Sequence, residues 1–378
     1  MSNVSIICEF NPLHNGHKYL LDTARSIEGI DTVACIMGGS FSQRADTYVA
    51  DRFVRARWAI QAGADIVAEM RGVSSMLNAE NFALSGVKSA IHLGSDYLLF
   101  GSECGDVDKL KKIANMLHAP TEHYTQRFQQ YISSGIVYPK AVSQAIADTL
   151  GAEYADVLAN PNDTLGIMYI KAIFQLNANI TPLATKRIDG GYHSHQQQSI
   201  YVSAEAIRKS PDKYVDCMPE FVYQYLSTIP ALESANLDTA ILTCIQNAEL
   251  STLSSIYDMA EGLQNKFATV AEKVDTLEEL LQLVKSKRYT LSRLKRLALY
   301  TLLNVTQDMV TLSINATKPR ILAIKKSHAG MLKGAISCYN DNVSSEDVRL
   351  WDIENRFSRV RATITRQPYS NQKNTIFI

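Results

Sequence analysis

The feature that most constrains the fold of this chain is a strand-to-helix turn near its N-terminus. Residues 4–8 read Val-Ser-Ile-Ile-Cys, an apolar run rich in β-branched side chains that predicts a buried strand. Asn11-Pro12 ends this strand, because proline cannot continue the hydrogen-bond ladder and restricts the residue before it. Apolar residues then recur at helical spacing between 20 and 24. The sequence His14-Asn15-Gly16-His17 therefore lies where a first strand gives way to a first helix.

The rest of the first half repeats this alternation. Further strands are predicted at 32–37, 65–69, 96–100 and about 180–188, and helices at about 51–62 and 79–93. Continuous apolar strands separated by helices of this length predict an α/β fold, a Rossmann-like parallel sheet covered by helices on both faces. Such sheets bind ligands at the carboxyl ends of their strands. The polar segments 11–17, 38–44 and 101–106 follow three of the strands, so we expect the binding site there.

The length of 378 residues suggests two or three domains. We place a boundary near Pro211, between a sheet-containing domain at 1–211 and a mostly α-helical domain at 212–378. The reason is that helical periodicity with few breakers runs from about 219 to 305. Farther on, 310–312 and 321–324 are candidates for strands or short helices.

Composition limits the possible partners and the compartment. The formal net charge is zero, so no global field attracts nucleic acid and any basic surface must be local. Six cysteines are scattered without Cys-x-x-Cys spacing, which indicates reduced thiols and predicts a cytoplasmic protein. The sequence shows no signal peptide and no apolar segment of membrane length, so we expect no membrane partner.

The paired histidines suit a phosphate site. Helix N-termini present unpaired N–H groups and a partial positive charge, which hold phosphate. Imidazoles at i and i+3 share a helical face and add donors where charge develops on a phosphate being cleaved. We therefore predict that His14 and His17 are catalytic, with Gly16 leaving room for a nucleotide. The pattern resembles the His-x-Gly-His signature of the nucleotidylyltransferases, which split ATP between its α and β phosphates; a surface loop or a metal pair is the alternative.

A second segment, Ser203 to Arg208, has the properties of a phosphate clamp. Ser203 is suited to cap a helix, and an arginine one turn later can hold the departing phosphates from the other side. It is similar to the second motif of the same superfamily. We predict that Arg208 is the third catalytic residue, the alternative being an ordinary capped helix with a surface arginine.

Further motifs make the resemblance closer. They are, in order along the chain, Cys8 to His17, Met37 to Arg44, Phe100 to Asp106, Asn160 to Gly166, Ser203 to Arg208 and Lys285 to Leu294. Together they resemble the bacterial tRNA(Met) cytidine acetate ligase family over essentially the whole chain. This resemblance implies that ATP, expected with Mg²⁺, activates acetate to acetyl-adenylate. It also implies that the acetyl group passes to the exocyclic amine of the wobble cytidine in elongator tRNA(Met).

The resemblance also implies a set of ATP contacts. They are Ile7, Cys8, Glu9, Phe10, Asn11, Pro12, Leu13, His14, Asn15, Gly16, His17, Lys18, Tyr19, Leu20, Gly101, Asn162, Arg187 and Ile188, and we add Ser203 from the second motif. Gly101 can let base or ribose pack on backbone, Asn162 can bond a base or ribose edge, and Arg187 can pair with phosphate. A turn glycine, a helix cap and a solvated charge are the respective alternatives.

Contact with tRNA is predicted from a local excess of positive charge. Eleven lysines and arginines lie between 285 and 333, against one acidic residue, Asp308. The residues predicted to bind tRNA are Lys285, Lys287, Arg288, Arg293 and Arg296, with Tyr289 among them for base stacking. A solvated helical face would show the same pattern. No metal site is predicted, because His193 and His195 lack a carboxylate or cysteine partner at ligand spacing.

Two other functions remain open at this stage. A small-molecule adenylyltransferase would share the phosphate motifs but would not need the helical, basic C-terminal third. A non-catalytic tRNA-binding protein could keep a nucleotide pocket. The chain also departs from the ligase family where Met70-Arg71 replaces a common Leu-Pro and where Gly39, Ser40 and Ala45 occur, which bears on acyl or tRNA contacts.

Overall fold

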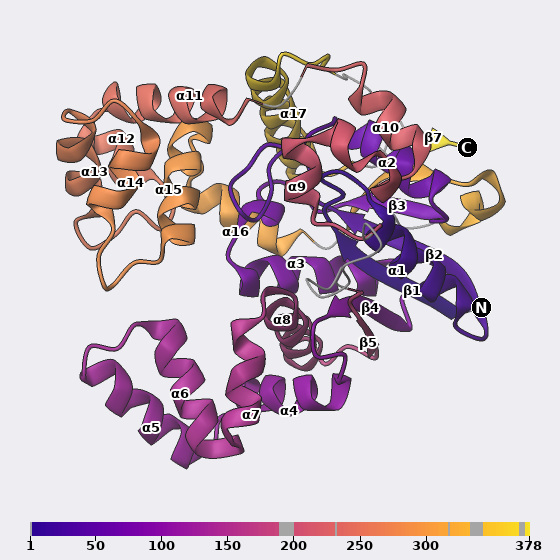
Figure 1. Ribbon diagram of the computed structural model, residues 1–378, viewed down its shortest axis with the longest axis horizontal. Helices are drawn as coiled ribbons and strands as arrows, with labels where there is room; N and C mark the ends of the chain where they lie inside the picture. The colour runs from indigo at the N-terminus through magenta and orange to yellow at the C-terminus, as the bar shows by residue number, and fades with distance from the viewer. Residues whose placement is uncertain (1, 189–199, 231–232, 317, 333–342, 370–374) are drawn as a thin grey trace.

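A seven-stranded sheet organises the fold and lies on the right in Figure 1. The computed structural model describes residues 2–188, 200–230, 233–316, 318–332, 343–369 and 375–378. The strands are β1 (Ser2–Cys8), β2 (Ile30–Met37), β3 (Ile66–Glu69), β4 (Tyr97–Ser102), β5 (Thr181–Lys186), β6 (Arg320–Ile324) and β7 (Ile376–Phe377). Their order across the sheet is β5-β4-β1-β2-β3-β6-β7.

The first five strands are parallel, as the sequence predicts. β1 lies between β2 and β4, and its Ser5 is paired with Ala34 on one side and Leu98 on the other. The predicted α/β class is thus confirmed, but the sheet is not wholly parallel. β6 pairs antiparallel with β3, and β7 is parallel to β6. Local periodicity identifies 321–324 only as a possible strand, because the partner of a long-range antiparallel pair is not written in the segment itself.

Helices cover both faces of the sheet. Those of the first half are α1 (Asn15–Ser26), α2 (Arg52–Gln61), α3 (Ala79–His92), α4 (Val107–His118), α5 (Glu122–Ser133), α6 (Tyr138–Leu150), α7 (Ala152–Ala155), α8 (Pro161–Gln175) and α9 (Ala204–Lys209). Neighbouring side chains of a strand point to opposite faces. In β1, Ile6 packs in a core with residues of α1 and α2, whereas Ile7 packs with residues of α3, α4 and α8.

The C-terminal half is mostly helical, as predicted. It contains α10 (Glu220–Leu226), α11 (Ser234–Gln246), α12 (Leu250–Ser255), α13 (Leu263–Ala271), α14 (Leu277–Val284), α15 (Leu291–Leu303), α16 (Gln307–Asn315) and α17 (Ser345–Thr365). Short 3₁₀ segments lie at Ser74–Met76, Asp156–Ala159, Pro211–Cys217 and Lys326–Leu332. Figure 1 shows α11 to α15 on one side of the sheet. Since β6 and β7 belong to the sheet, the sheet draws strands from both sides of the boundary at 211, which itself stays a prediction.

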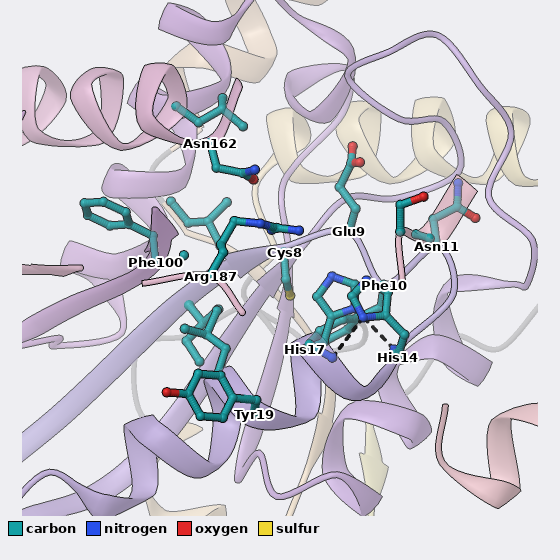
Figure 2. A pocket seen from close by; sticks show the side chains of 18 of the residues that line it. Cys8, Glu9, Phe10, Asn11, His14, His17, Tyr19, Phe100, Asn162 and Arg187 are labelled. Carbon is teal, nitrogen blue, oxygen red and sulfur yellow. Dashed lines mark hydrogen bonds between the residues drawn. The ribbon is translucent and has the colours of Figure 1, made fainter. Parts of the chain in front are cut away.

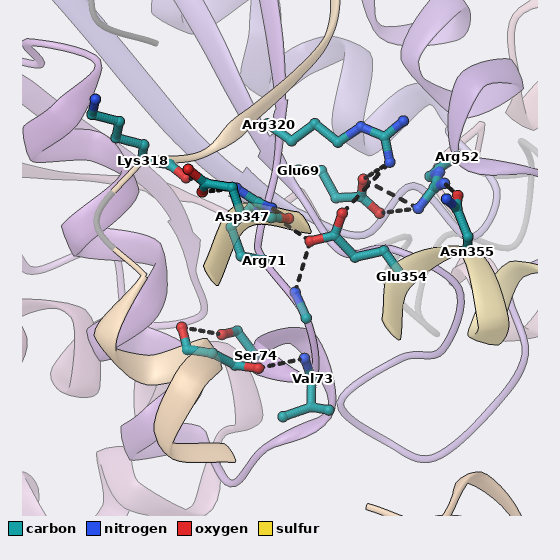
Figure 3. A network of polar contacts seen from close by, with 12 residues as sticks. Arg52, Glu69, Arg71, Val73, Ser74, Lys318, Arg320, Asp347, Glu354 and Asn355 are labelled. Atoms are coloured by element: carbon teal, nitrogen blue, oxygen red, sulfur yellow. Dashed lines mark hydrogen bonds and ion pairs between the residues drawn. The ribbon is translucent and has the colours of Figure 1, made fainter. Parts of the chain in front are cut away.

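The helical half is fixed to the sheet through a buried charge network (Figure 3). Arg52 of α2 donates to Glu69 at the end of β3, at 3.1 Å. Arg320 of β6 lies 3.6 Å from Glu69 and 3.5 Å from Glu354 of α17. Arg71 donates from Nε to Glu354 at 2.8 Å. Burial opposes ionisation of Glu354, but Arg71 and Arg320 outweigh it and lower the pKa of this carboxyl.

Candidate active site

A pocket opens where the carboxyl ends of β1, β4 and β5 meet the first turn of α1 (Figure 2). Most of the residues that the sequence predicts for the site line this pocket. They are Ile7, Cys8, Glu9, Phe10, Asn11, His14, Gly16, His17, Tyr19, Leu20, Gly101, Asn162, Arg187, Ile188, Ser203 and Arg208. They come from segments far apart in the sequence. The sheet topology thus brings the two predicted phosphate motifs, His14 to His17 and Ser203 to Arg208, into one cavity. This is where an α/β sheet is expected to bind its ligand, at the carboxyl ends of the strands.

Four residues of the predicted span do not line the pocket. Leu13 is fully buried in the core, and Pro12 adjoins it in the turn. Asn15 instead donates from its side chain to the carbonyls of Ile200 and Asp216, at 3.2 and 2.8 Å. Lys18 forms an ion pair with Asp22 one turn along α1. None of these four side chains lines the cavity, and those of Leu13 and Asn15 instead hold the start of α1 in place.

The two histidines cap α1 with their own rings. His14 is the N-cap residue, and its Nδ1 accepts a hydrogen bond from the N–H of Gly16 at 3.0 Å. His17 is the third residue of the helix, and its Nδ1 accepts from the N–H of His14 at 3.3 Å. A neutral imidazole carries one N–H, so both rings carry it on Nε2. An added Cβ at Gly16 would lie 2.9 Å from the His14 ring, which explains the glycine between them.

Both imidazoles are neutral at pH 7. Burial lowers the pKa of His14 to about 4, and the nearby cation of Arg187 adds to the shift. Burial, followed by the neighbouring His14 and Arg187, lowers the pKa of His17 well below its usual value. The pair can therefore donate two hydrogen bonds from Nε2 without bringing a charge of its own.

Two arginines lie beside the histidines. Arg187 follows β5, and its side chain has no hydrogen-bond or ion-pair partner among the described residues. Arg208 lies in the last turn of α9, donates to the carbonyl of Asn11 at 2.6 Å, and lies 3.9 Å from Asp46. Ser203 caps α9, its hydroxyl accepting from the N–H of Ala206 at 3.2 Å. The cavity is thus basic at the end where α1 and α9 meet.

Several residues that line the pocket are not among the site residues predicted from the sequence, although some lie within its motifs. They are Gln43, Asp46, Phe82, Phe100, Leu165, Tyr169, Thr185, Lys186, Tyr201 and Glu205. Phe82, Leu165 and Tyr169 lie in apolar helices, where their spacing predicts only a core position. A polar residue such as Glu205 looks like any helix-start acid. Only the packing of α3 and α8 against β4 brings the apolar ones to the cavity wall.

The predicted tRNA-binding residues lie elsewhere. Lys285, Lys287 and Arg288 are exposed between α14 and α15. Arg293 is held by Asp258 through two hydrogen bonds of 2.8 Å, and Arg296 is half-buried. The wider basic segment also contains Arg320, which is buried in the network of Figure 3, and Lys333, which lies outside the described residues. The exposed basic surface is therefore smaller than the sequence suggests.

Neither a metal-binding cluster nor a membrane-spanning helix occurs in the part of the chain that the structure describes. Among the described residues, no three His, Cys, Asp or Glu side chains gather so as to hold a metal ion. His193 and His195 lie outside those residues. Within the same described ranges, no helix combines the length and apolar character needed to span a bilayer.

Comparison with known proteins places this geometry in context. The profile of the HIGH Nucleotidyl Transferase family matches residues 1–361. A tRNA(Met) cytidine acetate ligase of Halothermothrix orenii is 33% identical over 81% of this chain and 78% of its own. One from Thermoanaerobacter sp. (strain X514) is 32% identical over 88% of this chain and 86% of its own.

Two crystal structures have the same fold. The apo structure of Thermotoga maritima TmcAL matches with a TM-score of 0.89 and 24% identity, over 100% of both chains. The structure of that protein bound with alpha-thio ATP matches with a TM-score of 0.87, again at 24% identity and 100% of both chains. At this identity the likeness shows a shared architecture.

Proposed function

The chain belongs to the HIGH nucleotidyl transferase family and, within it, to the tRNA(Met) cytidine acetate ligases, and from this premise we propose that it uses ATP to join acetate to a cytidine of tRNA(Met). The acceptor is the exocyclic amine of the wobble cytidine in the elongator tRNA. The observation that carries the proposal is the pair of neutral imidazoles whose Nε2 donors face a basic cavity at a helix N-terminus.

ATP is needed because acetate is a poor acyl donor. A carboxylate oxygen attacks the α-phosphorus, the bond to the β-phosphate oxygen breaks, and pyrophosphate leaves acetyl-adenylate behind. The amine then attacks the acetyl carbon and loses a proton to water, and AMP departs with the electron pair of the broken C–O bond. The protein supplies position and charge stabilisation rather than a nucleophile. His14 and His17 donate to the α- and β-phosphates, where negative charge builds up.

The arginines complete the grip on the phosphates. The guanidinium of Arg187, which has no hydrogen-bond or ion-pair partner among the described residues, is available for a bidentate contact. Arg208, anchored on the Asn11 carbonyl, holds the departing pyrophosphate from the side of α9. Ser203 keeps the first turn of α9 against the cavity.

We place ATP across the pocket-lining part of 7–20, with Gly101, Asn162 and Ile188 on its nucleoside side. Mg²⁺ commonly enters with ATP on its phosphates and one or two carboxylates. Asp46 and Glu205 line the pocket and are suitable ligands of that kind. Bound there, the ion would neutralise charge on the leaving group.

The tRNA contacts the exposed basic loop between α14 and α15 as well as the pocket. Figure 1 shows α14 and α15 away from α1, so the ligand must be large enough to reach both places. Lys285, Lys287 and Arg288 present charges suited to a nucleic acid backbone. The location is cytoplasmic, where thiols such as those of Cys8, Cys35, Cys104 and Cys244 stay reduced.

One assay tests the whole proposal. The protein is incubated with labelled acetate, elongator tRNA(Met) and either ATP or no nucleotide, and label in the tRNA is mapped by nuclease digestion. We expect label at the wobble cytidine only when ATP is present. A dinucleotide product, or tRNA binding without turnover, would contradict the proposal.

A further inference from the structure

Glu9 presents one unused carboxylate oxygen to the pocket. Its Oε1 accepts hydrogen bonds from the N–H of Gln43 at 3.0 Å and from the hydroxyl of Tyr48 at 3.1 Å. Tyr48 is fully buried under the guanidinium of Arg55, 3.8 Å from its ring centre, so this donor cannot move away. The second oxygen, Oε2, has no partner among the described residues, and Glu9 lines the cavity.

Asn162 presents a second acceptor. Oε1 of Glu103 accepts from the backbone N–H of Asn162 at 3.2 Å and from its Nδ2 at 2.6 Å, while Oε2 accepts from the N–H of Asp163 at 2.8 Å. An ionised carboxylate only accepts hydrogen bonds, so the amide nitrogen must face Glu103. The carbonyl oxygen Oδ1 of Asn162 is left without a partner among the described residues.

Tyr169 presents a donor. It lies in α8, is only 4% exposed, packs its ring against Phe100 with centroids 5.7 Å apart, and lines the same cavity. Its hydroxyl has no partner among the described residues. Burial, with help from the charge of Glu9, raises the pKa of Tyr169, so the hydroxyl keeps its proton. Buried polar groups take hydrogen-bond partners, so this hydroxyl is available to a molecule that enters the cavity.

These three groups lie in one compartment of the pocket. Glu9, Asn162 and Tyr169 all line the same cavity, and the carboxylate of Glu9 lies close enough to Tyr169 for its charge to act on the hydroxyl. Figure 2 shows Glu9 and Asn162 on one side of Arg187 and the two histidines on the other. The compartment is therefore distinct from the phosphate end of the cavity.

We propose that Glu9, Asn162 and Tyr169 form a subsite that recognises the amino edge of a nucleobase. Two fixed acceptors match the two N–H groups of an exocyclic amine, and the tyrosine hydroxyl matches the adjacent ring nitrogen. Adenine and cytosine share this edge, whereas hypoxanthine and uracil present a carbonyl beside a ring N–H and invert it. The inference rests on the proposed function, which supplies both bases, one from ATP and one from the tRNA.

Substituting Glu9→Gln tests the subsite with little change of shape. The amide oxygen of the new side chain must accept from Gln43 and Tyr48, so its NH₂ takes the place of Oε2 and turns an acceptor into a donor. The first measurement is acetate-dependent pyrophosphate exchange with ATP and with ITP, in which the amino group is replaced by a carbonyl. The second is acetyl transfer to tRNA(Met) from added acetyl-adenylate.

Each possible result either identifies the base that the subsite binds or contradicts the proposal. A fall of about ten- to a hundred-fold in the preference for ATP over ITP places adenine there. If the variant keeps its preference for ATP over ITP, but its rate of acetyl transfer to tRNA falls about as much relative to its rate of pyrophosphate exchange, the subsite binds the cytidine. Equal losses with ATP and ITP, together with transfer that tracks exchange, would overturn the inference, because a merely structural role moves all rates together.

A second variant guards against misfolding of the first. Tyr169→Phe removes one hydroxyl from a buried ring, and we expect it to shift the same measurement as Glu9→Gln in the same direction. Tyr138→Phe, on a side chain that is 66% exposed, and Glu272→Gln, at an exposed position beyond α13, are the matched controls. If the unmodified protein shows neither exchange nor transfer, the proposed function fails; normal activity with unshifted variants contradicts the subsite alone.

Discussion

The imidazole rings of His14 and His17 stack on each other, with centroids 3.8 Å apart and an angle of 30° between their planes. This stack depends on both rings being neutral. A proton added to Nδ1 of either ring would remove an acceptor that caps α1 and would place a cation against its neighbour. The capping and the lowered pKa values therefore belong to one arrangement, in which burial and the cation of Arg187 keep both rings neutral.

Removing a ring should abolish adenylation without unfolding the protein. We expect His17→Ala to reduce the rate of acetate-dependent pyrophosphate exchange by a factor of about 10² to 10³, the usual loss of a donor to transition-state charge. His14→Ala should lose the rate and, as the helix cap, about 1 kcal/mol of stability as well. Exchange rates and thermal unfolding are the measurements. His123→Ala, at an exposed position on α5, is the control, and full exchange in the His17 variant would refute the assignment.

The protonation of His14 should occur far below neutral pH. Burial lowers its pKa to about 4, so the imidazole Cε1–H signal in an NMR titration of the ligand-free protein should change near that value. Because the cation of Arg187 contributes to the shift, Arg187→Gln should raise the midpoint toward the ordinary histidine value. A midpoint near 6.5 in the unmodified protein would show that the ring is solvated and the stack is not formed.

The sequence predicts the parts of this site that depend on short-range order. The turn from β1 to α1, the capped start of α9 and the polar ends of the strands are each encoded within a few residues. For that reason the first five strands and the placing of both phosphate motifs in one cavity follow from local patterns. The role of Glu9 as a hydrogen-bond acceptor cannot be predicted from a local pattern. It depends on the hydroxyl of Tyr48, which binds one of the two equivalent carboxylate oxygens and leaves the other for the pocket.

Contacts between residues far apart in the sequence cannot be predicted from local patterns. Tyr169 looks like a core residue of an apolar helix until α8 is packed against β4. Arg71, which departs from the Leu-Pro common in the family, looks like a solvated charge. Its partner, Glu354, lies in α17 at the far end of the chain, and only the fold brings the two within 2.8 Å. Buried charged side chains of this kind pair with partners on other helices or strands, so a local sequence pattern does not predict them.

The network around Glu354 should support the attachment of α17 and β6 to the sheet. Glu354→Gln leaves Arg71 and Arg320 short of a buried counter-charge, for which we expect a loss of about 3 kcal/mol in the free energy of unfolding at pH 7. The pKa of Glu354 is lowered in the folded state, so its contribution is present above the unfolded value and is lost as the pH falls through the folded one. Urea unfolding at pH 7 and below pH 4 should therefore show a difference that shrinks in acid.

The matched control for this network is Asp352→Asn, an exposed position on the same helix. It changes a carboxylate to an amide without touching the buried charges, and we expect it to alter stability by no more than about 0.5 kcal/mol. Equal stability of the Glu354 variant and this control would mean that the buried charges contribute no net attachment energy.

The exposed loop between α14 and α15 should account for part of the salt dependence of tRNA binding. Lys285, Lys287 and Arg288 have free access to a phosphate backbone, whereas Arg293 is committed to Asp258. Each phosphate contact adds about 0.7 to 0.9 to the slope of log K against log salt. Changing the three exposed residues to glutamine should therefore weaken binding and lower that slope by about two. Filter binding of tRNA(Met) across a salt series measures both, with Lys273→Gln on the exposed turn after α13 as control. A slope equal to that of the unmodified protein would mean that these side chains are only a solvated surface and that the tRNA is held elsewhere.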